Sequence, residues 1–241
     1  MTGSDALHRL LDVQDQDTQA DQLRHRRENH PLRAELAGVR SQRQQLESRL
    51  GEEQERLGAL DARQNELEAE VTGARGRLEG IEKRMYSGEV GASRDLQAMA
   101  EEVDGLKGRI RRLDDVTHEV MEEREPVEAL VGQLGAELDA AVDREANIES
   151  ELGTAEQELS REEAEHAARR AELAAGVAPD LLARYERLRQ RLGGIGVARL
   201  VNGSCGGCHL TLPATELDRL RKAPPDADIT CEQCGRILVR A

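Results

Sequence analysis

Apolar residues recur every three or four positions through most of the first 160 residues, which is the spacing of a coiled coil. With Leu36 at heptad position a, a first seam runs from Leu32 to Met85, and thirteen of its sixteen a and d positions are apolar. A second seam runs from Leu96 to Leu159, and all nine of its d positions are apolar. Two sustained seams predict two long helices that pair along narrow apolar stripes.

The stretch between the two seams interrupts this pattern. Residues 86–95 read YSGEVGASRD, where small residues replace the apolar spacing. Two seams joined by a short break predict a long antiparallel coiled-coil helical hairpin with its tip near residues 86–95. Pro31 and Pro126 should break or kink the helices that contain them, so residues 5–29 are predicted to form a separate helix.

Polar residues inside the seams predict the register of the hairpin, because a polar a or d position loses hydration and needs a partner across the interface. If the chain folds back near residue 91, the numbers of facing residues sum to about 182 from simple hairpin geometry. The pairs predicted on this basis are Gln64 with Thr117, Glu53 with Arg124, and Arg43 with Glu145.

Composition limits what else the chain can build. Only two of its 241 residues are aromatic, both Tyr, while 34% are charged and the mean hydropathy is -0.66. Such a chain cannot fill a broad globular core, and a net charge of -14 argues against a protein that coats nucleic acid over its whole surface. The start, MTGSDALHRLLDVQDQ, lacks the pattern of a signal peptide, and no stretch approaches the ~18 apolar residues of a membrane span. We therefore expect a cytoplasmic protein with reduced thiols and no membrane partner.

The pattern changes to short elements after residue 176. LLARYERLRQRL continues a helix to about Leu192, and IGVARLV, HLTL, DIT and GRILV then read as strands around two cysteine knuckles, with PATELDRLRKA as a short helix between them. The fold class predicted is mainly α. Residues 1–175 form the coiled-coil hairpin, and residues 176–241 form a small α/β domain.

The four cysteines form two C-x-x-C pairs, Cys205 with Cys208 and Cys231 with Cys234, and 22 residues separate the pairs. Two such pairs aim four thiolates at one tetrahedral ion, which favours zinc. Cys205 to His209 also fits the C-x-x-C-H pattern of c-type haem attachment, but that reading leaves the second pair without a purpose. Iron in a rubredoxin-like site has the same spacing, although this segment lacks shielding aromatic residues beyond Tyr185. Four thiolates would complete the coordination of one structural zinc ion, so no catalytic residue is expected.

Three stretches resemble one known family. RMYSGEVGASRDLQAMAEEVDGLKGR at the hairpin tip, CGGCHLTLP at the first knuckle and CEQCGRILV at the second are similar to the bacterial C4-type zinc ribbon domain family, whose members carry a long N-terminal coiled-coil hairpin and a C-terminal four-cysteine ribbon. The resemblance implies binding rather than catalysis. It implies partners in transcription or sigma-factor regulation, in secretion and flagellar export, or among RNAs.

Two surfaces are candidates for contact with partners. At the tip, Met85, Tyr86 and Val90 lie near the end of the hairpin, and Tyr can anchor an interface. In residues 176–241, ten Arg and Lys outnumber seven Asp and Glu, and the basic candidates chosen from this domain are Arg219, Arg221 and Lys222. We expect a non-enzymatic adaptor with a protein partner, and RNA or DNA binding through the basic domain is the alternative. Pairing between copies of the chain stays open.

Overall fold

The computed structural model describes residues 3–88, 90–224, 227 and 229–240. The chain divides into two compact units, Glu35–Asn147 and the combination of Met1–Ala34 with Ile148–Ala241. Two long helices, α2 (Pro31–Tyr86) and α3 (Ser93–Ala174), each contribute to both units. Within the described residues, no helix combines the length and the apolar character needed to cross a membrane.

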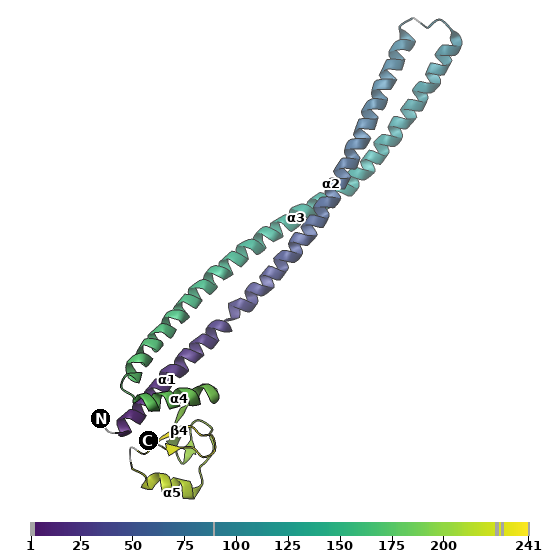
Figure 1. Cartoon of the computed structure of the whole chain (residues 1–241). Helices are drawn as coiled ribbons and strands as arrows, with labels where there is room; N and C mark the ends of the chain where they lie inside the picture. Colours follow the sequence, from purple (N-terminus) through teal and green to yellow (C-terminus); the bar gives the residue numbers. More distant parts are fainter. Residues whose placement is uncertain (1–2, 89, 225–226, 228, 241) are drawn as a thin grey trace. The chain divides into compact units, whose positions relative to one another are not determined.

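The unit Glu35–Asn147 is an antiparallel pair of helices, in which α2 and α3 lie side by side (Figure 1). Each buried side chain reported for α2 occupies a predicted a or d position, and these are Leu36, Val39, Leu46, Leu67, Val71 and Ala74. Across the seam, Leu46 packs with Leu134 and Ala141. The predicted coiled-coil hairpin and the mainly α fold class are therefore confirmed.

The helix boundaries follow local sequence. Helix α1 (Gly3–Glu28) ends just before Pro31, which begins α2, because proline at the first helical position loses no intrahelical hydrogen bond. Helix α2 ends at Tyr86 and α3 begins at Ser93, so the connection falls within residues 86–95. At Pro126, by contrast, α3 continues without interruption. Its neighbour Val127 is buried in the seam, which holds the helix in place where one backbone donor is missing.

The register differs in part from the prediction. Arg43 Nε donates to Glu145 Oε2 at 2.7 Å, as expected. The pairing of Glu53 with Arg124 is wrong, because Arg124 Nε instead meets Asp61 Oδ1 at 2.5 Å. The numbers of Glu53 and Arg124 sum to 177, whereas cross-helix ion pairs here sum to between 179 and 189, so Asp61 lies closer to the level of Arg124.

The predicted contact between Gln64 and Thr117 is also wrong. Gln64 Nε2 donates to Glu68 Oε1 at 2.8 Å, and Thr117 Oγ1 donates to the Leu113 carbonyl at 2.8 Å. Both polar groups thus find a partner on their own helix, one turn away. This local satisfaction removes the need for a partner across the seam.

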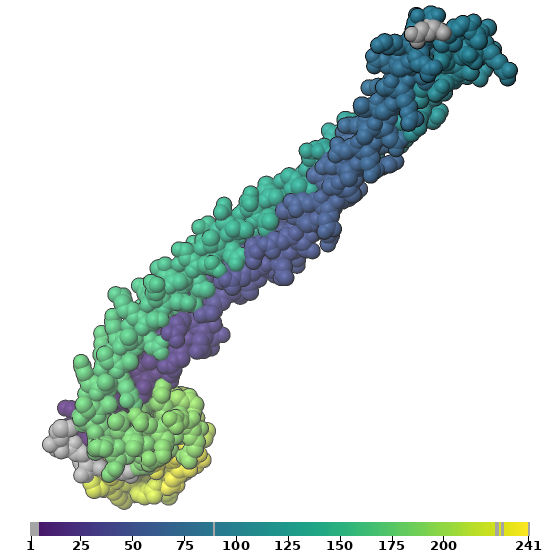
Figure 2. Space-filling model, turned by 45° about the horizontal axis from the view of Figure 1, so that its top comes forward, coloured from purple at the N-terminus to yellow at the C-terminus, as the bar shows by residue number. Residues whose placement is uncertain are grey.

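The second unit contains a four-stranded sheet in the order β2-β1-β4-β3, with β1 parallel to β4 and the outer pairs antiparallel. Its remaining elements are α4 (Pro179–Arg191), β1 (Val197–Val201), β2 (Ser204–Cys205), α5 (Ala214–Lys222), β3 (Ile229–Thr230) and β4 (Ile237–Arg240). Figure 2 shows the end of the chain, coloured green to yellow, gathered into one compact body.

The two faces of this sheet have different partners, because successive strand residues point to opposite sides. Val197 and Ile237 lie on the face that packs with Leu10 and Val13 of α1 and with Tyr185 of α4. The opposite face carries a second apolar cluster, which includes Ala198, Leu238, Leu220 and the cysteines. The sheet therefore joins the base of the hairpin on one side to the cysteine knuckles on the other.

Buried polar contacts tie α1 to the start of the ribbon. The Gln14 side chain is 4% exposed, its Nε2 donates to the Gly194 carbonyl at 2.9 Å, and its Oε1 accepts the Gly196 N–H at 2.8 Å. A Cβ at Gly196 would lie 2.7 Å from the Tyr185 carbonyl oxygen, so this position requires glycine. Tyr185 donates its hydroxyl to Asp17 Oδ2 at 2.7 Å. Burial, followed by this contact with a carboxylate, raises the pKa of Tyr185.

Charge reversal tests the observed register. Arg124→Glu should lower the melting temperature slightly, because it removes the ion pair with Asp61, and adding Asp61→Arg should restore part of the loss by re-forming the pair in the opposite sense. Adding Glu53→Arg instead should restore nothing. Thermal unfolding followed by circular dichroism compares these variants. Recovery of the melting temperature in the Arg124→Glu, Glu53→Arg double variant, and not in the double variant with Asp61→Arg, would contradict the register.

Gln14→Leu should lower the free energy of unfolding of the ribbon unit by about 1–3 kcal/mol, because it leaves the buried Gly196 N–H and the half-buried Gly194 carbonyl without partners. In a Tyr86→Phe background, Tyr185 is the sole tyrosine, so its fluorescence reports urea unfolding of this unit. Gln19→Leu, at an exposed position of the same helix, is the matched control. Equal losses in the two variants would argue against the role of Gln14.

Candidate metal centre

The four cysteines converge on one point between the two knuckles. The Sγ atoms all lie within 4.8 Å of one another. Cys205 Sγ is 3.9 Å from Cys234 Sγ, and Cys208 Sγ is 3.9 Å from Cys231 Sγ. A tetrahedron with zinc–sulfur bonds of about 2.3 Å has sulfur–sulfur edges of about 3.8 Å. All four thiols are free, and their spacing fits a single tetrahedral zinc ion.

The two knuckles share one backbone hydrogen-bond pattern. The carbonyl of Cys205 accepts the N–H of His209 at 2.8 Å, and the carbonyl of Cys231 accepts the N–H of Gly235 at 2.8 Å. In each knuckle the first cysteine also donates its own N–H to the carbonyl five positions later, at 3.0 and 2.9 Å. Local chain geometry therefore presents each pair of thiols in the same way.

This shared pattern explains the histidine that follows the first knuckle. His209 has a φ of 61°, and Gly235 has a φ of 75° at the equivalent position of the second knuckle. His209 is exposed, and the group of converging ligand atoms consists of the four thiols without its ring. His209 therefore occupies a left-handed turn position outside the group of ligand atoms.

Close packing explains the two glycines inside the first knuckle. A Cβ at Gly206 would lie 2.9 Å from the Arg199 carbonyl oxygen, which also accepts the Gly206 N–H at 2.8 Å. A Cβ at Gly207 would collide with the Arg236 side chain. In the second knuckle the two residues between the cysteines, Glu232 and Gln233, are exposed and carry larger side chains.

The surroundings of the thiols act in opposite directions on their ionisation. Burial raises the pKa of Cys205 and raises that of Cys231 to about 12. Burial also acts upward on Cys234, but hydrogen bonds from Arg236 and Cys231 outweigh it and lower the pKa of Cys234 to about 7. A dication at the centre of the cluster would favour all four thiolates, because its charge offsets the cost of burying them.

Two arginines, one directly before the last strand and one at its end, hold the ribbon together. Arg236 donates from Nε to the Ile195 carbonyl and from Nη2 to the Leu192 carbonyl, both at 2.9 Å, which ties the second knuckle to the end of α4. Arg240 Nη1 donates to the carbonyls of Leu220 and Ala223 at the end of α5. The sequence did not mark these arginines, because a basic residue in or beside a short strand ordinarily faces water.

The three predicted basic residues lie together on α5. Arg219 Nη2 is 2.6 Å from Glu232 Oε1, and Lys222 Nζ is 2.5 Å from Asp218 Oδ2. Arg221 is exposed and, among the described residues, has no carboxylate within ion-pair distance. Two of the three charges are therefore already paired.

The predicted tip residues lie at and just after the end of α2. The Tyr86 side chain is 86% exposed, whereas Met85 and Val90 are half-buried. The tip thus presents one large aromatic side chain to solvent.

Comparison with known proteins shows relatives along the whole chain. An uncharacterised protein of Mycobacterium tuberculosis is 29% identical over 231 residues, which cover 96% of this chain and 94% of the relative. A solved structure from Mycobacterium smegmatis covers 100% of both chains at 25% identity, with a TM-score of 0.89. CT398 of Chlamydia trachomatis shares the fold, with a TM-score of 0.72 at 22% identity over 99% of both chains.

Family models match both parts of the sequence. Residues 204–238, which hold the four cysteines and the strands β2 and β3, match the C4-type zinc ribbon domain. Residues 13–193, which cover the seams and the helices on either side, match the coiled-coil hairpin. With three quarters of its length accounted for by that hairpin, the chain belongs to the CT398-like coiled coil hairpin domain family.

Proposed function

We propose that this protein is a non-enzymatic zinc-binding adaptor of the cytoplasm, which contacts protein partners through its zinc ribbon and its hairpin tip. The observation that carries the proposal is the closed set of four thiols, two pairs of which are 3.9 Å apart. Reduced thiols at this spacing suit a compartment in which disulfides do not form.

The thiol cluster supports a structural ion rather than a catalytic one. One zinc ion would be held by Cys205, Cys208, Cys231 and Cys234, and four thiolates leave no coordination position for water or a substrate. The apolar cluster of Ala198, Leu220 and Leu238 packs the cysteines of the two knuckles against the sheet. Such a centre fixes the shape of a binding platform and performs no reaction of its own.

The exposed side chains favour a protein as the partner. Tyr86 offers a large amphipathic ring at the tip, and aromatic residues of this kind anchor protein interfaces. On α5, Arg219 and Lys222 are already paired with carboxylates, so less positive charge is free to neutralise phosphates. Nucleic-acid binding through α5 is therefore the alternative to a protein partner.

Metal analysis of the purified protein should find one zinc ion per chain. A chelator should unfold the ribbon while most helical signal in circular dichroism remains, because the seams do not depend on the metal. Cys231→Ser should lose the ion, whereas His209→Gly should keep it, because the His209 ring lies outside the cluster. Loss of zinc in His209→Gly, or a haem absorbance band, would overturn the assignment.

Crosslinking in native cytosol tests the contact surfaces. Tyr86→Ser should remove the protein crosslinks made at the tip, whereas Tyr86→Phe should retain most of them, because the ring supplies the contact area. Titration with RNA and with DNA at two salt concentrations tests the alternative. Tight, salt-sensitive binding that Arg219→Glu, Arg221→Glu and Lys222→Glu together abolish would replace the adaptor with a nucleic-acid-binding regulator.

A further inference from the structure

The distal part of the hairpin has a charge opposite to that of the rest of the chain. Between residues 75 and 112, nine Lys and Arg outnumber seven Asp and Glu, whereas the remaining residues carry 25 basic and 41 acidic side chains. The densest run of positive charge lies on α3, where residues 107–112 read KGRIRR, with four cations and no acid. A basic segment is therefore built into an acidic protein.

An open groove lies within this basic segment, between α2 and α3. Its lining consists of Leu78 and Ile110 on the floor and of Arg75, Lys107 and Arg111 around them, and its volume is about 570 Å³.

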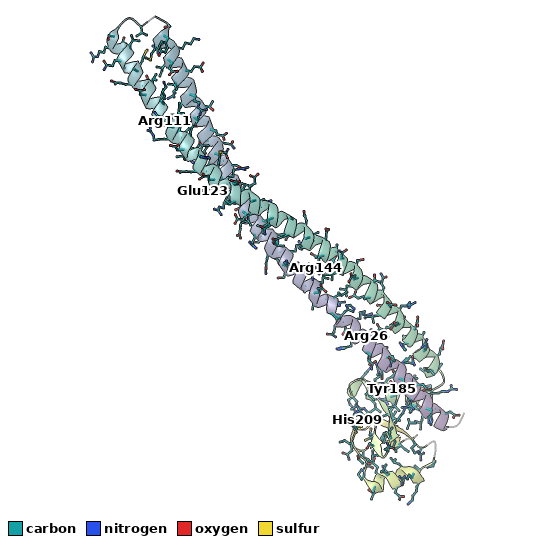
Figure 3. All side chains as sticks on the ribbon, turned by 180° about the vertical axis from the view of Figure 1, so that it is seen from behind. Arg26, Arg111, Glu123, Arg144, Tyr185 and His209 are labelled. Atoms are coloured by element: carbon teal, nitrogen blue, oxygen red, sulfur yellow. The ribbon has the colours of Figure 1, made fainter. Side chains whose placement is uncertain are left out.

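The cations around the groove differ in how far they are already paired. Arg75 Nη2 lies 3.2 Å from Asp114 Oδ2, and Lys107 Nζ lies 2.8 Å from Glu82 Oε1. Arg111 makes only a long hydrogen bond from Nε to the Lys107 carbonyl, at 3.4 Å, and no carboxylate of the described residues lies within ion-pair distance of it. Figure 3 shows Arg111 on the distal part of the hairpin. Arg111 thus offers an unneutralised guanidinium beside an apolar floor.

We propose that this groove binds an amphipathic helix from an acidic protein partner. The apolar floor of Leu78 and Ile110 fits the apolar side chains of such a helix, and the cationic rim fits Asp and Glu on its flanks. Arg111 pairs with one of these carboxylates in a bidentate manner, which its planar guanidinium allows. This proposal rests on the adaptor function and assigns the chemistry of one partner surface.

The same flank disfavours a nucleic acid. On α3, the residues that follow Lys107 at intervals of seven, and therefore lie on the same flank, are Asp114, Met121 and Glu128. Met121 and Glu128 line a second hollow together with Asp61, Glu122 and Glu125. A phosphate backbone that followed the flank would meet these carboxylates. Tyr86 is also the sole aromatic side chain of this basic region, so successive bases would find no row of stacking partners.

Peptide binding to the full-length, zinc-loaded protein tests the proposal. The probe is a fluorescent helical peptide of about 20 residues, with Leu at positions i, i+3, i+4 and i+7 and Glu on both flanks. One control peptide replaces Glu by Lys, and another replaces Leu by Ser. Fluorescence anisotropy should show binding of the peptide that carries both Leu and Glu, and of neither control peptide. Arg111→Glu should raise the Kd of that peptide roughly tenfold.

Matched variants separate a local site from general charge attraction. Arg49→Glu makes the same charge change at an exposed position of α2 outside the groove, and it should leave the Kd within about twofold. Equal weakening by Arg111→Glu and Arg49→Glu, equal binding of the Ser peptide, or tighter binding of a single-stranded RNA of equal charge would overturn the groove proposal. The adaptor function would stand in each case if crosslinking still depended on Tyr86, so the two failures are distinguishable.

Discussion

A near absence of aromatic side chains constrains every part of this structure. With two aromatic residues in the whole chain, no region can be stabilised by a thick core. The hairpin responds by burying single side chains along a seam, as Leu46, Leu134 and Ala141 do. The ribbon responds by placing its one tyrosine, Tyr185, at the centre of the cluster shared by α1, α4 and the sheet, where it is fully buried. On the other face of the sheet, free thiols fill the position that apolar side chains occupy in larger domains.

Periodicity and spacing predicted the parts of the fold that depend on repetition. The seam positions of Leu36 and Val71 follow from a heptad count, and the convergence of Cys205 with Cys234 follows from two matched pairs of cysteines. Neither inference needs knowledge of how distant segments meet. The start of α2 at Pro31 was equally accessible, because it depends on local backbone chemistry alone.

Contacts between distant segments were not predictable in the same way. Gln14 and Gly196 are 182 positions apart, and nothing in their local sequence indicates that they pair. A weak signal did exist in α1, where Gln14, Asp17 and Asp21 repeat at helical spacing close to Leu10, as polar residues that share a buried network do. The error at Arg124 has a related origin, because a long side chain can reach any of several carboxylates, and a sum of residue numbers cannot choose among them.

The matching backbone of the two knuckles has a consequence for how this small domain is organised. Each knuckle closes with the same pair of backbone hydrogen bonds and has a residue with a positive φ at its fifth position, although one knuckle reads CGGCH and the other CEQCG. The two knuckles are therefore an internal repeat at the level of main-chain geometry, although their side chains differ. Such a repeat leaves the fifth position of either knuckle open to any residue that tolerates a positive φ.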